Sequence, residues 1–196
     1  MIGIYCIQLG QLVHLKIVVI LLLKGSLKLL KISISVRGVK FVEYRYTNGG
    51  VKLVIDDNVV NKLSSFSQLF TGDVESGGLL LGRTQINGLT KVYDITEPLE
   101  RDKRGRFLFK RKDKGHLELV SQANERCLYF KGNWHSHPQK NPSPSWRDKV
   151  SWKRAMRESK PGNSDYIFFL IVGTKEIKAW CGKLNNRKIY EMELQS

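Results

Sequence analysis

Trp134-His135-Ser136-His137-Pro138-Gln139-Lys140-Asn141-Pro142-Ser143-Pro144-Ser145-Trp146-Arg147-Asp148 is the stretch of this chain that most narrows its fold. It holds two histidines separated by one residue, followed by an aspartate after ten intervening residues. Two imidazoles and one carboxylate suit a borderline-soft divalent metal, above all zinc. Three protein ligands leave one coordination position open for water, as in catalytic zinc sites. The stretch therefore predicts a catalytic metal site at His135, His137 and Asp148.

The spacing of these residues also predicts local structure. Two histidines at the end of a strand point to the same face, because side chains alternate with period 2. Pro138 ends such a strand, and Ser145 is a good helix N-cap with Asp148 in the first turn. An isolated His-x-His pair is typical of two surface histidines beside a turn. The longer pattern, which adds Pro-x-Pro-Ser-x-x-Asp, favours a metal site.

The composition indicates a globular protein with a strong positive charge. The chain has 196 residues, of which 41% are hydrophobic and 26% charged, which suits one domain with an extension. The 33 Lys and Arg residues against 18 Asp and Glu residues give a net charge of +15. This charge favours acidic partners such as nucleic acid, anionic lipid or an acidic protein, without choosing among them.

The cysteines indicate a reducing compartment. The chain has three of them, Cys6, Cys127 and Cys181, which are far apart and form no Cys-x-x-Cys pair. A disulfide framework is therefore not expected, and we expect a cytoplasmic protein. Cys127 and Cys181 are interpreted as small buried hydrophobic residues.

Residues 1–37 differ from the rest of the chain, because residues 1–23 are predominantly apolar. A membrane-spanning helix needs about 20 such residues, and this segment contains Lys16. It has neither the positive start nor the cleavage site of a signal peptide. Three interpretations remain: a weak membrane anchor, an additional strand or helix, or a translation start placed too far upstream. We favour the last, and a membrane partner is not expected.

The remaining sequence alternates between strand and helix patterns. We expect strands at 41–46 and 51–55 around an Asn48-Gly49-Gly50 turn, and at 79–81, 89–95, 127–134, 166–172, 176–184 and 188–194. We expect helices at 59–70, with an apolar stripe of Val59, Leu63, Phe66 and Phe70, at 115–125, with Leu117, Val120 and Ala123 inward, and at 145–160, stopped by Pro161-Gly162.

Glu75 stands directly before the buried Leu79–Leu81 strand rather than on a solvated helix. By itself it is typical of a strand-edge carboxylate paired with a basic residue. With a metal motif downstream, a carboxylate at a strand entrance is a candidate general base. We therefore include Glu75 among the catalytic residues.

Three segments of the chain together resemble the JAMM (JAB/MPN) metalloprotease family. They are Glu75 with Gly77-Gly78-Leu79-Leu80-Leu81-Gly82, then Gly132-Asn133-Trp134-His135-Ser136-His137-Pro138, and finally Pro142-x-Pro144-Ser145-x-x-Asp148. The resemblance extends from about residue 40 to the C-terminus. It implies an α/β domain over residues 38–196, with a central mixed curved β-sheet flanked by helices and a zinc site at the sheet edge. It leaves residues 1–37 as an apolar extension of uncertain status.

The same resemblance implies a role for each motif residue. His135, His137 and Asp148 resemble the three zinc ligands. Glu75 resembles the glutamate that holds the attacking water and shuttles its proton, and Ser145 resembles the serine that hydrogen-bonds the oxyanion. Asn133 departs from the glutamate common in close relatives, but it lies outside the ligand set.

The chain looks most like the stand-alone prokaryotic branch of that family, in which a charged, Phe-containing segment and a helix precede the histidine strand. Members of this branch occur in anti-phage defence operons that use cyclic-oligonucleotide signals, where they remove a nucleotidyltransferase from a ubiquitin-like conjugate. The resemblance implies zinc-dependent hydrolysis of an isopeptide or C-terminal peptide bond after a ubiquitin-like protein. The expected partner is that protein or its conjugate, with the nucleotidyltransferase as a candidate target.

Two alternatives from other functional classes remain open. One is a non-catalytic MPN-type module that binds protein, although scaffolding relatives typically lose metal ligands and this chain keeps them. The other is a basic nucleic-acid-associated JAB-like protein, which the charge allows but the His137-Pro138-Gln139 sequence does not favour. A zinc nucleobase deaminase is not favoured, because the chain has no Pro-Cys-x-x-Cys motif.

Much of the positive charge is concentrated in residues 101–114. Taken alone, such a segment is typical of a solvated basic loop. Under the metalloprotease hypothesis we expect it to border the substrate groove. Reversing the charge at Arg104 and Lys110 should then weaken substrate binding and leave the metal content unchanged.

Overall fold

The computed structural model describes residues 2–9, 12–23, 26–36, 44–159 and 164–195. The chain divides into two compact units, Met1–Phe41 and Val42–Ser196, which are described separately. The expected domain boundary at residues 37 and 38 and the expected helix stop at Pro161-Gly162 lie outside the described residues.

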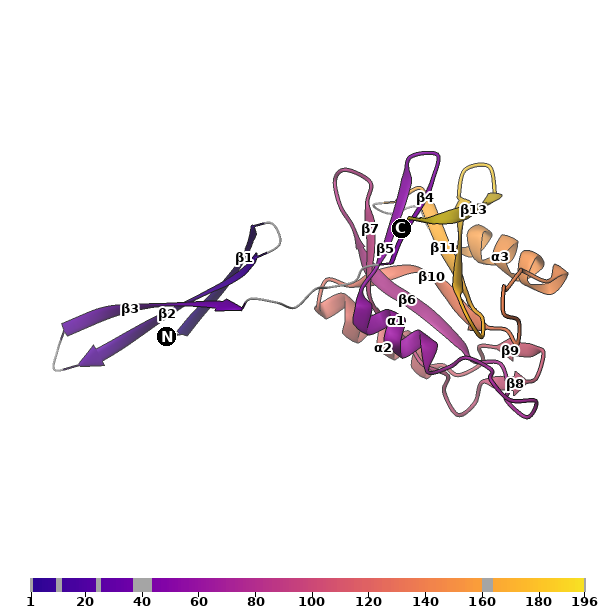
Figure 1. Cartoon of the computed structure of the whole chain (residues 1–196), viewed down its shortest axis with the longest axis horizontal. Coiled ribbons are helices and arrows are strands. Elements are labelled where there is room, and N and C mark those ends of the chain that lie inside the picture. The colour runs from indigo at the N-terminus through magenta and orange to yellow at the C-terminus, as the bar shows by residue number, and fades with distance from the viewer. Residues whose placement is uncertain (1, 10–11, 24–25, 37–43, 160–163, 196) are drawn as a thin grey trace. The chain divides into compact units, whose positions relative to one another are not determined.

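The first unit is a three-stranded antiparallel sheet in the order β1-β2-β3 (Figure 1). Its strands are β1 (Ile2–Leu9), β2 (Leu12–Leu23) and β3 (Ser26–Val36). Within the ranges given above, no helix is both long enough and apolar enough to cross a membrane.

Among the described residues, the second unit is built on eight strands that close into a ring, in the order β10-β11-β12-β13-β4-β5-β7-β6. The neighbours β10 and β11, and β5 and β7, run parallel, and the other pairs are antiparallel. The strands are β4 (Tyr44–Asn48), β5 (Val51–Ile55), β6 (Gly77–Thr84), β7 (Thr90–Ile95), β10 (Tyr129–Ser136), β11 (Tyr166–Val172), β12 (Ile177–Lys183) and β13 (Lys188–Gln195).

The mixed strand directions agree with the predicted α/β class and mixed sheet, and this sheet closes into a barrel, which the sequence analysis did not predict. Closure comes from pairing between the first and last strands of the unit, with Tyr46 of β4 opposite Leu194 of β13. These residues are far apart in the sequence, and nothing in the local pattern of either strand specifies its partner.

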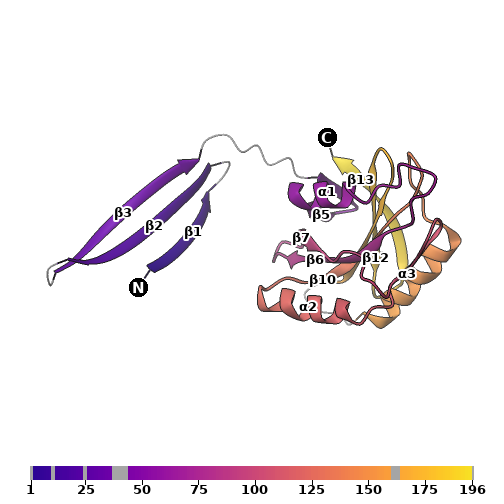
Figure 2. The ribbon, with the colours of Figure 1, turned by 90° about the horizontal axis from the view of Figure 1, so that it is seen from below.

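In the part of the chain that the structure describes, three helices cover the strands: α1 (Asp57–Ser64), α2 (Gly115–Glu125) and α3 (Trp146–Glu158). Leu80 of β6 belongs to the cluster that contains α1, whereas the next residue, Leu81, packs against α2. Because neighbouring strand residues point to opposite faces, α1 lies on one face of the sheet and α2 on the other (Figure 2). The helix α3 packs through Trp152, which stacks on Phe169 of β11 with a ring separation of 4.5 Å.

The helix α1 is shorter than predicted. It ends at Ser64, so Phe66 and Phe70 lie beyond it, and Phe70 is 76% exposed. Ser64 and Ser65 donate their hydroxyls to helix carbonyls, and such side-chain bonds compete with continued helix. Phe66 instead packs on Trp134, with their rings 5.1 Å apart.

Two burial predictions around α2 are wrong. Leu117, expected to face inward, is 72% exposed, whereas His116 is 2% exposed. Cys127, expected to be buried, is exposed in a left-handed conformation with φ 57°, although Cys181 is buried as expected. The cause at α2 is a polar network: His116 lies 2.8 Å from a carboxylate oxygen of Asp102, and this contact rotates the helix away from the apolar pattern.

The basic segment is not a simple solvated loop, because it forms a hairpin of β8 (Lys103–Gly105) and β9 (Leu108–Lys110). Asp102 organises it from a buried position, where its carboxylate accepts hydrogen bonds from backbone N–H groups on both sides of the hairpin. Those donors are the amides of Leu99, Lys112 and Asp113. The basic side chains of β8 and β9 remain exposed.

Candidate metal centre

The two histidines lie at the carboxyl end of β10, at the rim of the barrel. His135 pairs with Gly77 of β6 on one side and with Ile171 of β11 on the other. The backbone N–H of His137 donates to Val172 at 2.9 Å. Because β10 has a neighbour on each side, the histidines lie at the carboxyl end of an interior strand, and the expected zinc site at the sheet edge stays a prediction.

The carboxylate of the candidate site belongs to Asp148, in the first turn of α3. Ser145 is its N-cap and accepts a hydrogen bond from the Asp148 N–H at 3.2 Å, while a carboxylate oxygen of Asp148 accepts from the Ser145 N–H at 2.7 Å. This reciprocal capping box fixes the direction of the Asp148 side chain. Trp152 anchors the next turn in the core, 6.4 Å from the His135 ring.

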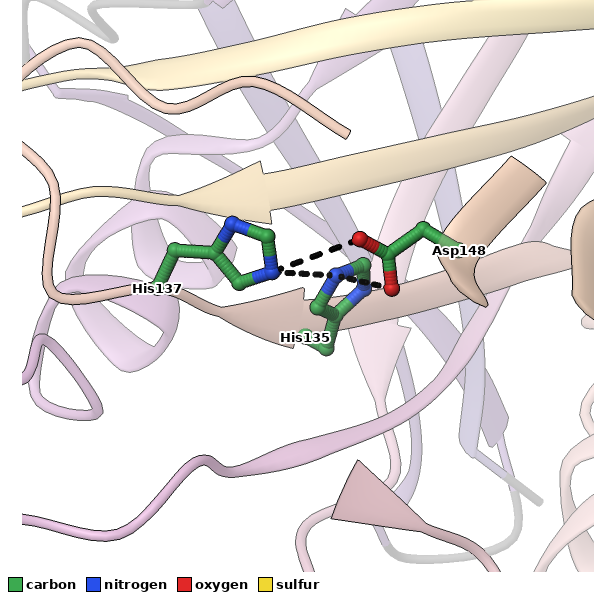
Figure 3. A group of neighbouring side chains, drawn as sticks. All are labelled: His135, His137 and Asp148. Atoms are coloured by element: carbon green, nitrogen blue, oxygen red, sulfur yellow. Dashed lines mark hydrogen bonds and ion pairs between the residues drawn. The ribbon is translucent and has the colours of Figure 1, made fainter. Parts of the chain in front are cut away.

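His135, His137 and Asp148 point toward one another from these two elements (Figure 3). The two Nε2 atoms are 3.1 Å apart, His135 Nε2 is 3.2 Å from Asp148 Oδ1, and His137 Nε2 is 3.5 Å from Asp148 Oδ2. Tetrahedral zinc with bonds of about 2.0–2.2 Å places its ligand atoms about 3.3–3.6 Å from one another. The three side chains therefore fit zinc in both chemistry and spacing.

The environment also favours the protonation states that a metal requires. Burial, followed by the charge of His135, lowers the pKa of His137 and so favours its neutral ring. Burial alone would raise the pKa of Asp148, but hydrogen bonding and charge from His135 and the Ser145 contacts outweigh it and lower that pKa. A neutral imidazole and an ionised carboxylate are the forms that bind metal.

Gln139 fixes the tautomer of His137. Its Oε1 accepts from the Ser143 N–H at 3.0 Å, which identifies this atom as the amide oxygen. The same oxygen is 3.3 Å from His137 Nδ1, so Nδ1 must carry the hydrogen and donate it. The lone pair of His137 then lies on Nε2 and faces the cluster, as a ligand nitrogen requires.

Glu75 lies beside this cluster at the entrance to β6. Its carboxylate oxygen is 3.7 Å from His137 Nε2, and the residue is 6% exposed. Burial raises the pKa of Glu75 to about 7, with the charge of His135 acting against this rise and that of Asp148 adding to it. A carboxyl group with such a pKa can accept and release a proton near neutral pH.

The β8–β9 hairpin holds the backbone of Glu75. The Glu75 N–H donates to Gly105 at 2.8 Å, and Arg104 Nε donates to the Glu75 carbonyl at 3.0 Å. Arg104 also donates to the hydroxyl of Ser76. The sequence analysis expected Arg104 only to border the substrate groove. Because Arg104 also holds the Glu75 carbonyl, reversing its charge would disturb Glu75 as well as any substrate contact. Lys110, which is exposed, remains suited to a charge-reversal test.

Ser145 is exposed at the start of α3. Its oxygen accepts the N-cap hydrogen bond, and within the described ranges its hydroxyl hydrogen has no acceptor. The hydroxyl can therefore donate to a group that approaches the cluster.

Sequence reasoning missed two residues that support the site, Gln139 and Arg104. Gln139 lies in a proline-rich loop, where an amide side chain has no distinctive pattern. Arg104 was expected, like Lys110, to border the substrate groove, and no pattern in the basic segment indicates that it holds the backbone of Glu75. Asn133, which departs from the family pattern, accepts a hydrogen bond from Arg111 at 2.8 Å.

Comparisons with known proteins support a family assignment. The family described as prokaryotic homologs of the JAB domain matches residues 71–182, a range that includes Glu75, Ser145 and the three ligand-type residues. A Vibrio cholerae protein named "CD-NTase/cGAS isopeptidase" is 37% identical over 135 residues, which cover 67% of this chain and 81% of that protein. An Escherichia coli protein with the same name is 34% identical over 134 residues, with the same coverage.

Among solved structures, a solution structure of a Desulfitobacterium hafniense protein matches with a TM-score of 0.49 and 19% identity. The match covers 72% of this chain and 88% of that one.

Proposed function

This chain belongs to the family of prokaryotic homologs of the JAB domain, and from that premise we propose that it is a zinc-dependent isopeptidase. Its reaction is hydrolysis of the bond that joins a ubiquitin-like protein to its target. The observation that carries the proposal is the convergence of His135, His137 and Asp148 beside the buried carboxylate of Glu75.

The two histidines and the aspartate hold the zinc ion in this proposal. When bound, zinc supplies a Lewis acid that polarises the amide carbonyl and acidifies water. The protein contributes the fixed direction of each ligand, through the capping box for Asp148 and the Gln139 contact for His137.

Glu75 moves the proton. Its carboxylate accepts the proton of the attacking water and returns it to the leaving amine, which becomes a good leaving group only when protonated. Its position beside His137 and its raised pKa support this role. Hydrogen bonds between its backbone and the β8–β9 hairpin, one donated by each side, hold the carboxylate beside the cluster.

Ser145 stabilises the negative charge that develops on the carbonyl oxygen. Its hydroxyl hydrogen is free to donate, because its oxygen serves only as an N-cap acceptor among the described residues. A donor held in place before the reaction stabilises such a charge without a cost of reorganisation.

The proposed substrate is a conjugate between a ubiquitin-like protein and a CD-NTase, the class of target named for the relatives from Vibrio cholerae and Escherichia coli. The leaving group is then the amine of a target lysine. The exposed basic side chains of the β8–β9 hairpin, such as Lys103 and Lys110, lie on the segment that holds Glu75 and are available to an acidic substrate surface.

Glu75→Gln tests the mechanism, because it removes the proton acceptor and keeps the size of the side chain. We expect zinc content near one ion per chain and cleavage of the conjugate reduced by at least about 10²-fold. Cleavage would be followed by gel electrophoresis and zinc by elemental analysis. Glu118→Gln, an exposed change on α2, is the matched control and should keep full activity.

Full activity in Glu75→Gln would contradict the assigned role of this residue. Wild-type protein that binds the conjugate, contains zinc and never cleaves it would contradict the enzymatic proposal and favour a protein-binding module.

A further inference from the structure

A β-bulge lies at the start of β10, at the opposite end from the histidines. The register with β6 shifts between Phe130, opposite Leu81, and Gly132, opposite Leu80, so that Lys131 is the extra residue. Gly132 has φ 153°, and a Cβ at this position would collide with the carbonyl of Phe168. Only glycine therefore allows this approach of β10 to β11. Bulges of this kind re-aim side chains and are common next to functional sites.

The re-aimed Lys131 lines a cavity of about 540 Å³. This volume lies within the range of about 300–1,000 Å³ that is typical of small-molecule sites. Phe130, Ile167 and Leu184 contribute apolar surface, and Tyr129 and Tyr166 add two aromatic rings. The described residues that line the cavity include no aspartate or glutamate.

The ammonium group of Lys131 has no negatively charged partner among the described residues. The residue is only 7% exposed, and among the described residues no hydrogen-bond acceptor or carboxylate contacts its ammonium group. Burial lowers its pKa, as expected for a lysine without a compensating charge. Every buried side-chain nitrogen and oxygen atom of the described residues has a partner, so the unpaired ammonium of Lys131 keeps access to solvent, and an anion that enters the cavity can supply the missing charge.

Arg83 adds a second positive charge to the lining. Its guanidinium is held in place by hydrogen bonds of 2.9 Å to the carbonyls of Cys127 and Arg126. Two of its five N–H groups are used in these bonds, and the others can face a ligand. The cavity thus combines apolar and aromatic walls with two cations.

We propose that this cavity binds a small organic anion, in which a phosphate or carboxylate meets Lys131 and an aromatic or apolar body contacts Phe130 and Ile167. The site is separate from the metal centre, since Lys131 precedes His135 by four strand residues, about 13 Å along β10. Its occupancy can therefore be tested without conjugate cleavage.

Cys127 provides a local reporter, because it is exposed and lines the same cavity. Its rate of alkylation by iodoacetamide would be followed by peptide mass spectrometry, which separates it from the other cysteines. Phenyl phosphate and benzoate should slow this reaction at least fivefold in a saturable manner, and comparing them shows which anion is preferred. Benzyl alcohol, which has a similar body and no charge, should give little protection. Equal protection by benzyl alcohol, or none by either anion, overturns the proposal.

Lys131→Met tests the assigned contact, because methionine keeps the length and loses the charge. We expect at least a tenfold weaker apparent affinity for the anions, with unchanged zinc content. Lys153→Met, on the exposed side of α3, is the matched control and should behave as wild type. Unchanged affinity in Lys131→Met would overturn the proposal. If that variant does not fold, the wild-type comparison of benzoate with benzyl alcohol still decides the question.

Discussion

Gln139 shows how much a single residue contributes to the metal centre. Its one amide oxygen accepts hydrogen bonds from the Ser143 N–H and from His137 Nδ1. The first bond shapes the proline-rich loop, and the second presents the His137 lone pair to the cluster. Partners that orient a metal-binding histidine in this way typically contribute 10–100-fold to metal affinity.

Gln139→Leu should therefore lower zinc affinity by about 10–100-fold, because leucine cannot accept the Nδ1 hydrogen. Competition with a chromophoric zinc chelator would measure the change. Gln139→Glu keeps an acceptor oxygen and should bind zinc nearly as well as wild type. Wild-type affinity in the leucine variant would show that the loop, rather than this hydrogen bond, orients His137.

At the scale of elements, the β8–β9 hairpin depends on Asp102. This carboxylate accepts three backbone hydrogen bonds, and the ring of His116 lies 2.8 Å away. The other ring nitrogen of His116 is 3.0 Å from the hydroxyl of Thr96, which connects the hairpin to the end of β7. Since the hairpin in turn holds the backbone of Glu75, this network supports the position of Glu75 from a distance.

Asp102 should make the stability of the domain depend on pH. Burial would raise its pKa, but hydrogen bonds from Asp113, Leu99, His116 and Lys112 outweigh burial and lower the pKa from 3.8 to about 2. A lowered pKa in the folded state stabilises the protein above the unfolded value, and this stability is lost as pH falls toward 2. A shift of this size corresponds to roughly 2 kcal/mol.

Urea unfolding of wild type and Asp102→Asn should therefore differ by roughly 2 kcal/mol at pH 5 and by less than about 1 kcal/mol at pH 2.5. The metal ligands are the same in both proteins, so their titration cancels in the difference. Asp165→Asn, an exposed control, should differ from wild type by less than about 0.5 kcal/mol at either pH. A wild-type advantage that does not change with pH would show that charge on Asp102 is unimportant.

At the scale of the whole molecule, the site belongs to one unit of the chain. Among the residues whose burial the structure describes, three hydrophobic clusters form within Val42–Ser196, and the family match over residues 71–182 lies in the same unit. A unit with its own core can fold independently. We therefore propose that the expected domain, residues 38–196, contains everything that the metal centre requires.

A chain of residues 38–196 should bind about one zinc ion and unfold cooperatively, with a midpoint within a few degrees of the full-length protein. Thermal unfolding followed by circular dichroism, with elemental analysis of zinc, would measure both properties beside the full-length control. Loss of zinc or of the cooperative transition would show that residues 1–37 contribute to the fold of the domain.

Local patterns in the sequence predicted many elements well. The Asn48-Gly49-Gly50 turn joins β4 and β5, with Gly49 and Gly50 at the positive φ values that such hairpin turns need. The serine before α3 caps it as expected. These features depend on residues within a few positions of one another, so the sequence alone is sufficient to predict them.

Features that depend on distant partners were not predicted. The inward side of α2 is decided by Asp102 and Thr96, which contact His116 from other elements. Beyond the end of α1, the position of Phe66 is decided by Trp134, on which it packs. In each case a tertiary contact outweighs the apolar period of the helix.

The sequence by itself determined which side chains could form a metal site, because two histidines at strand spacing and an N-capped aspartate are local patterns. It also determined the strands and helices that carry them. Only the tertiary structure decided that the strands close into a barrel, that Glu75 lies 3.7 Å from His137, and that Lys131 faces a cavity. The physical reason is that strand partners, bulges and buried polar networks depend on contacts between residues far apart in the chain, and no local pattern specifies those contacts.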